Sequence, residues 1–243
     1  MTNANLVGAI LTGAVLEQAH MKGANLDQAT LTGVDFTHAN LDDAGLDRAV
    51  LTNANLTDAH LDSANLTGAT LTGATLDHAD IDDADVTGVN LTGAVLNDLH
   101  ATGANLTGAT LTSATLANDK LNEANLTGAT FTSATLTDDN LAAAVLTGAT
   151  LTSATFTDCD LKRAVLTDAV LTDAALGTTY LDGANLTGAQ LNDATLTDVD
   201  LSHANLTNAN LSGATLADVR WRDTTCPDGT NSDRDGDSCA SDL

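Results

Sequence analysis

A five-residue pattern runs from Ala4 to Trp221 without one inserted or deleted residue. Its central position falls at every fifth residue from Leu6 to Leu216, and 36 of these 43 residues are Leu. A second column, two residues before each centre, is mostly Ala. A period of five excludes an amphipathic helix, because at about 100° per residue successive Leu would step roughly 140° around the axis. In a strand, residues two apart share a face, so the repeat predicts a β-solenoid of short strands and corners.

Exceptions in the Ala column show how many repeats make one coil. Seven of them recur at every fourth repeat: Leu99, Asp119, Asp139, Cys159, Thr179, Val199 and Val219. An environment that returns at every fourth repeat indicates four repeats per coil and a four-sided cross-section. About eleven coils at about 4.8 Å each predict a rod on the order of 53 Å long. We number its faces by their first centres, which are Leu6, Leu11, Leu16 and Met21.

Repeats such as ANLTG, at Ala64, Ala104, Ala124 and Ala184, resemble the pentapeptide repeat family, whose consensus is A-(D/N)-L-x-x. The resemblance covers roughly nine-tenths of the chain. It implies a right-handed quadrilateral β-helix with Leu and Ala inside and the other three positions outside. We therefore expect an all-β solenoid at residues 1–221, followed by a short irregular C-terminal cap and acidic loop at residues 222–243.

The charge of the chain is strongly acidic, with a formal net charge of −25. Before Arg222 the chain has 27 acidic and six basic residues. This balance argues against direct binding to nucleic acid or to anionic membranes. It is compatible with solubility, with a basic partner, or with imitation of DNA, since a duplex of the same length carries roughly 31 charges. No apolar run approaches the length of a membrane span.

Two acidic residues occupy nominally inward positions on the fourth face. Asp119 and Asp139 follow one another in adjacent coils, and Cys159 and Thr179 continue their column. A buried carboxyl group is costly unless it is hydrogen-bonded or protonated. Either the face turns these residues outward or they form a buried polar ladder. No nucleophile or base accompanies them, so we expect no enzymatic activity.

The second face carries two columns of Thr on either side of its Leu centres. The pairs that define this Thr face are Thr70, Thr72, Thr110, Thr112, Thr130, Thr132, Thr150 and Thr152. We expect both hydroxyl groups of each T-L-T triplet to lie along one strand. The grid then looks like the T-x-T surface of insect ice-binding β-helices, which belong to another family. Alternatively, Thr occurs here because it favours strands and stacks well.

The C-terminal segment ends the repeat. Trp221 stands where the next Leu would be and is expected to cover the open core, because terminal coils of a solenoid need a cap. Cys226 and Cys239 flank a polar loop and predict a disulfide, which indicates an extracytoplasmic or secreted protein. The alternative is two free thiols in a cytoplasmic protein.

The same loop has the spacing of a calcium site. Asn231, Asp233, Asp235, Asp237 and Asp242 take ligand positions around Gly236, and the loop resembles thrombospondin type 3 calcium repeats. An acidic, solvated tail is the alternative. No cofactor other than Ca²⁺ is expected.

Three functions remain open from the sequence. The first is a non-enzymatic rod, monomeric or an end-to-end dimer, which presents repetitive faces to an unknown protein partner. The second follows from the resemblance, since some pentapeptide repeat proteins mimic DNA, bind DNA gyrase and protect it from quinolones. The third is an ice- or crystal-binding surface on the Thr face.

Overall fold

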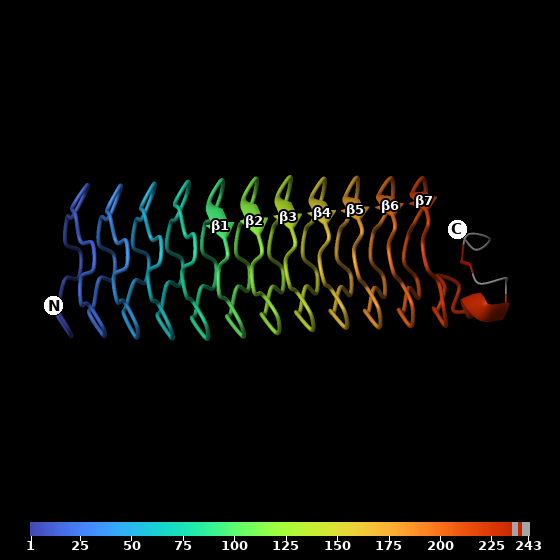
Figure 1. The fold of residues 1–243 in the computed structure, drawn as a ribbon, viewed down its shortest axis with the longest axis horizontal. Coiled ribbons are helices and arrows are strands. Elements are labelled where there is room, and N and C mark those ends of the chain that lie inside the picture. The colour runs from blue at the N-terminus through green and yellow to red at the C-terminus, as the bar shows by residue number, and fades with distance from the viewer. Residues whose placement is uncertain (235–237, 240–243) are drawn as a thin grey trace.

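The computed structural model describes residues 1–234, 238 and 239, which form a rod of stacked coils (Figure 1). Parallel bridges join each coil to the next, from Asn5 with Asn25 to Asn205 with Thr225. Since every coil makes one such link on each of four sides, the predicted all-β, four-sided solenoid is confirmed. The first and last coils of the described chain lie at opposite ends of the rod.

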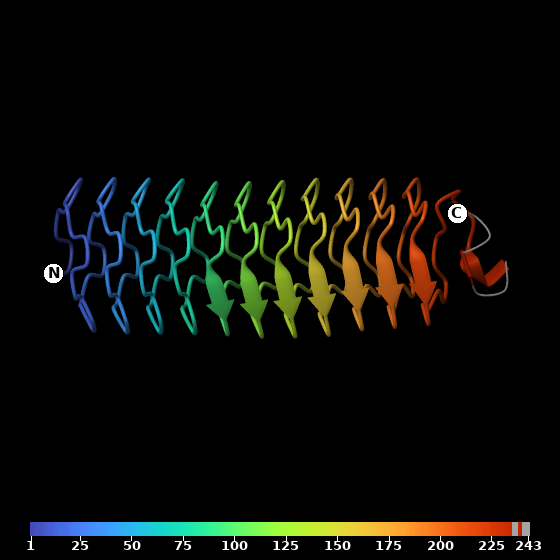
Figure 2. The same ribbon diagram turned by 90° about the horizontal axis from the view of Figure 1, so that it is seen from above.

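One face of the rod is a continuous parallel sheet, seen as a row of arrows in Figure 2. Neighbouring strands pair in chain order, with Leu96 opposite Leu116 and so on from coil to coil. The seven strands are β1 (Val95–Asn97), β2 (Thr115–Ala117), β3 (Thr135–Thr137), β4 (Thr155–Thr157), β5 (Ala175–Gly177), β6 (Thr195–Thr197) and β7 (Thr215–Ala217). All lie on the third face. The helical element of the described chain is the short 3-10 helix η1 (Ser232–Arg234).

Most corners of the coil are closed by a backbone hydrogen bond, and the backbone conformation of these turns explains which residues occupy the fifth position of the repeat. The amide of Ala9 donates to the carbonyl oxygen of Leu6 at 2.9 Å, and Gly8 between them has φ +64°. The residue in the same place of nearly every repeat also has a positive φ. Left-handed backbone is easiest for Gly and is tolerated by Asn and Asp. The fifth letter of the repeat is therefore rich in Gly, Asp, Asn and Ser.

One corner opens from the fifth coil onward. In the first four coils Ala19, Ala39, Ala59 and Ala79 close the corner after the third face with the usual turn bond. Where Leu99 and its six successors replace Ala, that bond is missing among the described residues, and the three-residue strands β1–β7 appear instead. Val34 and Val89 on other faces keep closed turns of 3.1 and 3.2 Å. The open corner thus coincides with the residues other than Ala in this one column, and it recurs in each of the seven coils that carry them.

The core is a single column of aliphatic side chains. Centres and inward Ala residues from Met21 to Leu211 are buried, and Phe36, Phe131 and Phe156 are the largest of them. The repeat geometry extends past the expected boundary at residue 221. Thr225 pairs with Asn205, while Thr224 and Cys226 point inward and are fully buried. The solenoid therefore includes one more repeat than the sequence pattern indicated.

We predict that Leu126→Ala lowers the free energy of unfolding by roughly 2–5 kcal/mol, because Leu126 is fully buried and its coil is held on both sides. Chemical denaturation followed by circular dichroism measures the loss. The matched control is Thr112→Ala, whose hydroxyl points outward, and it should change stability by less than about 0.5 kcal/mol. Equal effects of the two substitutions would contradict this assignment of inside and outside.

Candidate interaction surfaces and the buried aspartate ladder

Asp119 and Asp139 lie inside the rod, each 1 % exposed. Oδ1 of Asp119 accepts the amide of Leu99 at 2.8 Å, and Oδ1 of Asp139 accepts the amide of Asp119 at 2.8 Å. These are the amides that lost their turn acceptor when the corner opened. The structure thus has the buried polar ladder, in which each carboxyl group replaces a backbone carbonyl in the preceding coil.

Burial also raises the pKa values of the two carboxyl groups in the ladder. Desolvation, reinforced by the neighbouring Asp139 charge, raises the pKa of Asp119 to about 9. Desolvation also raises the pKa of Asp139 to about 7, against the backbone hydrogen bonds that favour its ionised form. The second oxygen of each carboxyl group has no hydrogen-bond partner within the described residues. Burial of a carboxyl oxygen without a hydrogen-bond partner costs less free energy when the group is protonated and uncharged.

Cys159 and Thr179 continue the column with weaker polar contacts. Cys159 Sγ donates to the carbonyl oxygen of Thr157 at 3.4 Å, and Thr179 Oγ1 donates to that of Gly177 at 3.2 Å. Burial raises the pKa of the Cys159 thiol to about 12, so this thiol is a packed side chain rather than a nucleophile. The arrangement of the column is that of a structural element.

The Thr face on the second side is only partly strand-like. Thr110 and Thr130 pair between coils, whereas Thr112 and Thr132 fall at the start of the corner turns. The expectation that both Thr of each triplet lie along one strand is therefore wrong for this face. Triplets with both Thr on a strand occur on the third face, in β3, β4 and β6. The open corner, which sequence reasoning missed, is what extends those strands.

Acidic residues gather on the third and fourth faces. Counting each five-residue unit as one face, these two carry 21 of the 27 acids between residues 1 and 221, the buried Asp119 and Asp139 included. We call the corner between them the acidic edge, with the column Asp58, Asp98, Asp138, Asp158, Asp198 and Asp218. Two of its carboxylates lie beside histidine side chains of the preceding coil, with His38 3.6 Å from Asp58 and His78 3.5 Å from Asp98.

The acidic edge deepens toward the C-terminal end. A hollow of about 530 Å³ there is lined by Tyr180, Asp198, Asp218 and Arg220 among others. Arg220 pairs with Asp200 at 2.8 Å, and Lys162 lies 4.8 Å from the centre of the Tyr180 ring. On the fourth face, partial desolvation and a hydrogen bond with Asp80 raise the pKa of Asp62 to about 6. These features make a surface that favours cations.

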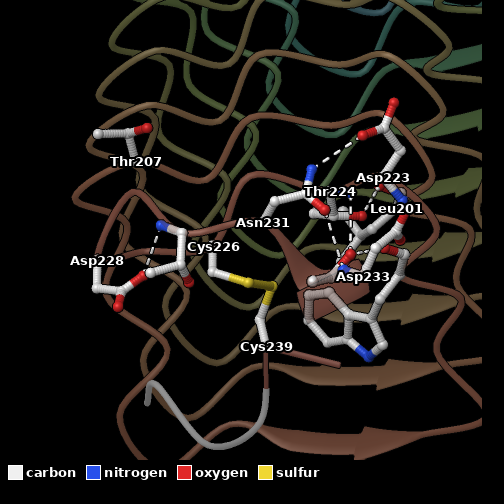
Figure 3. The surroundings of a disulfide bond; sticks show 12 residues. Leu201, Thr207, Asp223, Thr224, Cys226, Asp228, Asn231, Asp233 and Cys239 are labelled. Atoms are coloured by element: carbon white, nitrogen blue, oxygen red, sulfur yellow. Dashed lines mark hydrogen bonds between the residues drawn. A yellow bond between two sulfur atoms is a disulfide. The ribbon is translucent and has the colours of Figure 1, made fainter. Parts of the chain in front are cut away.

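The cap closes the C-terminal end through a disulfide between Cys226 and Cys239 (Figure 3). Ser232 in the cap, which sequence reasoning missed, is fully buried. Its hydroxyl donates to the carbonyl oxygen of Trp221 and accepts the amide of Thr224, so it joins η1 to the last coil. Trp221 itself is 6 % exposed and packs into the core, as expected of a cap residue.

The described residues of the predicted calcium loop are engaged in the cap. Asn231 donates to Asp223 at 2.9 Å, and Asp233 accepts the amide of Asp223 at 2.8 Å. Asp235, Asp237 and Asp242 lie outside the described residues. Within the described part, no group of three His, Cys, Asp or Glu residues is placed to hold a metal ion. No helix of the described chain is long and apolar enough to cross a bilayer.

The ladder predicts a pH dependence of stability. Unfolded carboxyl groups titrate near pH 4, so above that value the folded state holds protons that the unfolded state releases. The free energy of unfolding should therefore fall as the pH rises from about 4 through the folded pKa values of about 7 and about 9. The double variant Asp119→Asn, Asp139→Asn should flatten this slope in denaturation curves recorded across the window. Thr179→Val, in the same column without a titrating group, should keep the slope, and an unchanged slope in the Asn variant would refute a ladder protonated in the folded state.

The disulfide predicts a redox-dependent stability. It closes a loop of 13 residues and should contribute about 3 kcal/mol. The variant Cys226→Ser, Cys239→Ser should lose that amount in urea denaturation. Reductant should bring the wild type down to the level of the variant and leave the variant unchanged. A thiol count on the unfolded, unreduced chain should give one free thiol, from Cys159.

The repeat that builds this architecture matches a known protein family. The family model for pentapeptide repeats matches residues 1–37, 31–68, 54–93, 90–128, 111–148, 144–183 and 179–218. None of the curated proteins matches the chain.

Solved structures match the chain at low identity. HetL, a pentapeptide repeat protein involved in heterocyst differentiation regulation from the cyanobacterium Nostoc, is 28 % identical, with 95 % of this chain and 92 % of that chain covered and a TM-score of 0.33. Two trypsin-treated forms of QnrB1, a plasmid-mediated fluoroquinolone resistance protein, are 21 % and 20 % identical. They cover 66 % and 65 % of this chain and 86 % and 91 % of their own, with TM-scores of 0.50 and 0.53. Because the family model matches overlapping stretches from residue 1 to residue 218, the chain belongs to the pentapeptide repeat family.

Proposed function

We propose that this protein is a non-enzymatic, extracytoplasmic binding rod whose acidic edge docks a basic protein partner. The observation that carries the proposal is the gathering of 21 of 27 acids on two adjacent faces of a solenoid, all but Asp119 and Asp139 of them outside the core. Parallel coils place the carboxylates of the acidic edge one or two coils apart, at about 4.8 Å per coil along the rod. Such an array attracts a cationic partner over its whole length and orients it along the axis.

The ladder and the cap support a binding role rather than catalysis. Asp119 and Asp139 are buried, and the Oδ1 atom of each accepts a hydrogen bond from a backbone amide. The disulfide supports an oxidising compartment, because such bonds persist mainly outside the cytosol. The alternative location is the cytoplasm.

Two other functions have an observation in their favour. Imitation of DNA in binding DNA gyrase is favoured by the column of acids along the acidic edge, whose members lie one or two coils apart. Binding to ice or another crystalline surface is favoured by the Thr columns of the second face. Protection of gyrase supercoiling from a quinolone, and shaping of ice crystals, test these two alternatives directly.

The proposal is tested by removing charge from the acidic edge alone. The variant Asp138→Asn, Asp158→Asn, Asp198→Asn, Asp218→Asn should fold, since Asn tolerates the positive φ of these positions. The matched control removes an equal number of charges from the first face, by Asp→Asn substitutions at Asp27, Asp47, Asp85 and Asp168. Each protein is immobilised and exposed to the extracellular proteins of its source.

The expected result is a basic protein that the wild type and the control retain in low salt and the edge variant does not. Its retention should weaken as salt is raised, because the contact is electrostatic. Equal retention by the edge variant, or retention of an acidic protein only, would overturn the proposal.

A further inference from the structure

The second face is the uncharged side of an otherwise acidic rod. Of the 27 acids between residues 1 and 221, the second face carries two, Asp173 and Asp193, and both lie at its trailing corner. Its outward columns on either side of the Leu centres hold no charged residue in any coil. The first, third and fourth faces carry four, nine and twelve acids.

The fold does not require this neutrality. The position after the centre, which is Thr on the second face from Thr12 to Thr172, is Asp27 and Asp47 on the first face and Asp77 on the third. All of these positions share the same turn geometry. Charge is therefore compatible with the repeat at that position, and its absence along one whole side is a property of the surface.

Most hydroxyl groups of this face make no hydrogen bond within the described residues; Thr172, which donates to Asn192 at 3.1 Å, is the exception. On the first face, Thr67, Thr107 and Thr127 donate to the Asn two residues earlier at 2.6 to 2.7 Å. On the second face, within the part of the chain that the structure describes, the Thr pairs form no side-chain hydrogen bond; these residues are Thr70, Thr72, Thr110, Thr112, Thr130, Thr132, Thr150 and Thr152. A hydroxyl group both donates and accepts, so two such arrays can satisfy one another.

We propose that the second face is the contact through which two copies of this chain pair side by side. With a net charge of −25 on each copy, the approach of any other pair of faces brings more carboxylates together. A second copy also has the same coil pitch, so the Thr columns of two rods stay in register along their whole length.

The size of the face fits such a contact. A face about 50 Å long and about 15 Å wide offers on the order of 750 Å², using about 4.8 Å per coil and about 3.3 Å per residue. A stable interface buries about 800 Å² on each partner. The pairing uses a face separate from the acidic edge, so it leaves that surface open for the partner proposed above.

When the two faces overlap along their whole length, a two-fold contact places the middle coil of one rod against the middle coil of the other, whether the rods run parallel or antiparallel. The sixth of the eleven coils holds Thr112 on the second face and Thr107 on the first. Wild-type protein in sedimentation velocity should show a species of twice the 24.6 kDa chain mass. Dimerisation should tighten with added salt, because screening reduces repulsion between two acidic rods and removes no attraction in a neutral interface.

Charge placed on the second face tests the contact. Thr112→Asp with Thr132→Asp should weaken dimerisation at least tenfold, whereas Thr107→Asp with Thr127→Asp, in the same coils and at the same repeat position, should leave it unchanged. Thermal unfolding of each variant shows that both pairs fold.

A single introduced thiol gives an independent readout. Thr112→Cys should form a covalent dimer under mild oxidation and Thr107→Cys should not, since Cys159 is buried and Cys226 and Cys239 are already bonded. A monomeric wild type at every concentration overturns the proposal, and ice shaping by such a monomer would assign the face to a crystalline surface instead. The proposal is also overturned if the dimer forms equally well with Thr112→Asp and Thr132→Asp and is not crosslinked through Thr112→Cys, a result that would indicate an end-to-end dimer.

Discussion

The backbone pairing between coils is the constraint on which the rest of this structure depends. Leu6 donates to the carbonyl oxygen of Asn25 at 2.7 Å, and Asn25 donates back to that of Ala4 at 2.9 Å. The same pairing joins every coil to the next along the rod, always at the same separation in the chain. An inserted residue would shift every later side chain by one place and turn Leu outward, so a chain that pairs this way keeps its period without exception.

Pairing at a fixed spacing also aligns equivalent corners along the rod. From Leu99 onward the corner after the third face is open in seven coils in succession, and the strand of each coil pairs with that of its neighbour. Opening frees backbone amides inside the rod, where an unpaired amide is costly. The side chains of Asp119 and Asp139 accept hydrogen bonds from two of these amides. The raised pKa values of both carboxyl groups favour the uncharged form, which reduces the cost of burying them.

Sequence reasoning succeeded where the determinant is local and failed where it lies one coil away. The four-sided coil followed from exceptions at every fourth repeat, and the disulfide followed from two Cys flanking a loop. The open corner could not be read in advance, because Val89 closes its turn on one face while Val199 lies at an open corner on another. Burial of Ser232 and Thr224 in the cap likewise depends on contacts across the chain end.

Because Leu and Ala encode the fold from the inside, the outward positions are free to carry the function. Their contents differ between faces although their backbone geometry is shared. On the first face Asn and Thr side chains bond to each other and stabilise their own turns. On the third and fourth faces carboxylates accumulate. A neutral second face beside them divides the rod into one side that attracts cations and one side that another acidic rod can approach.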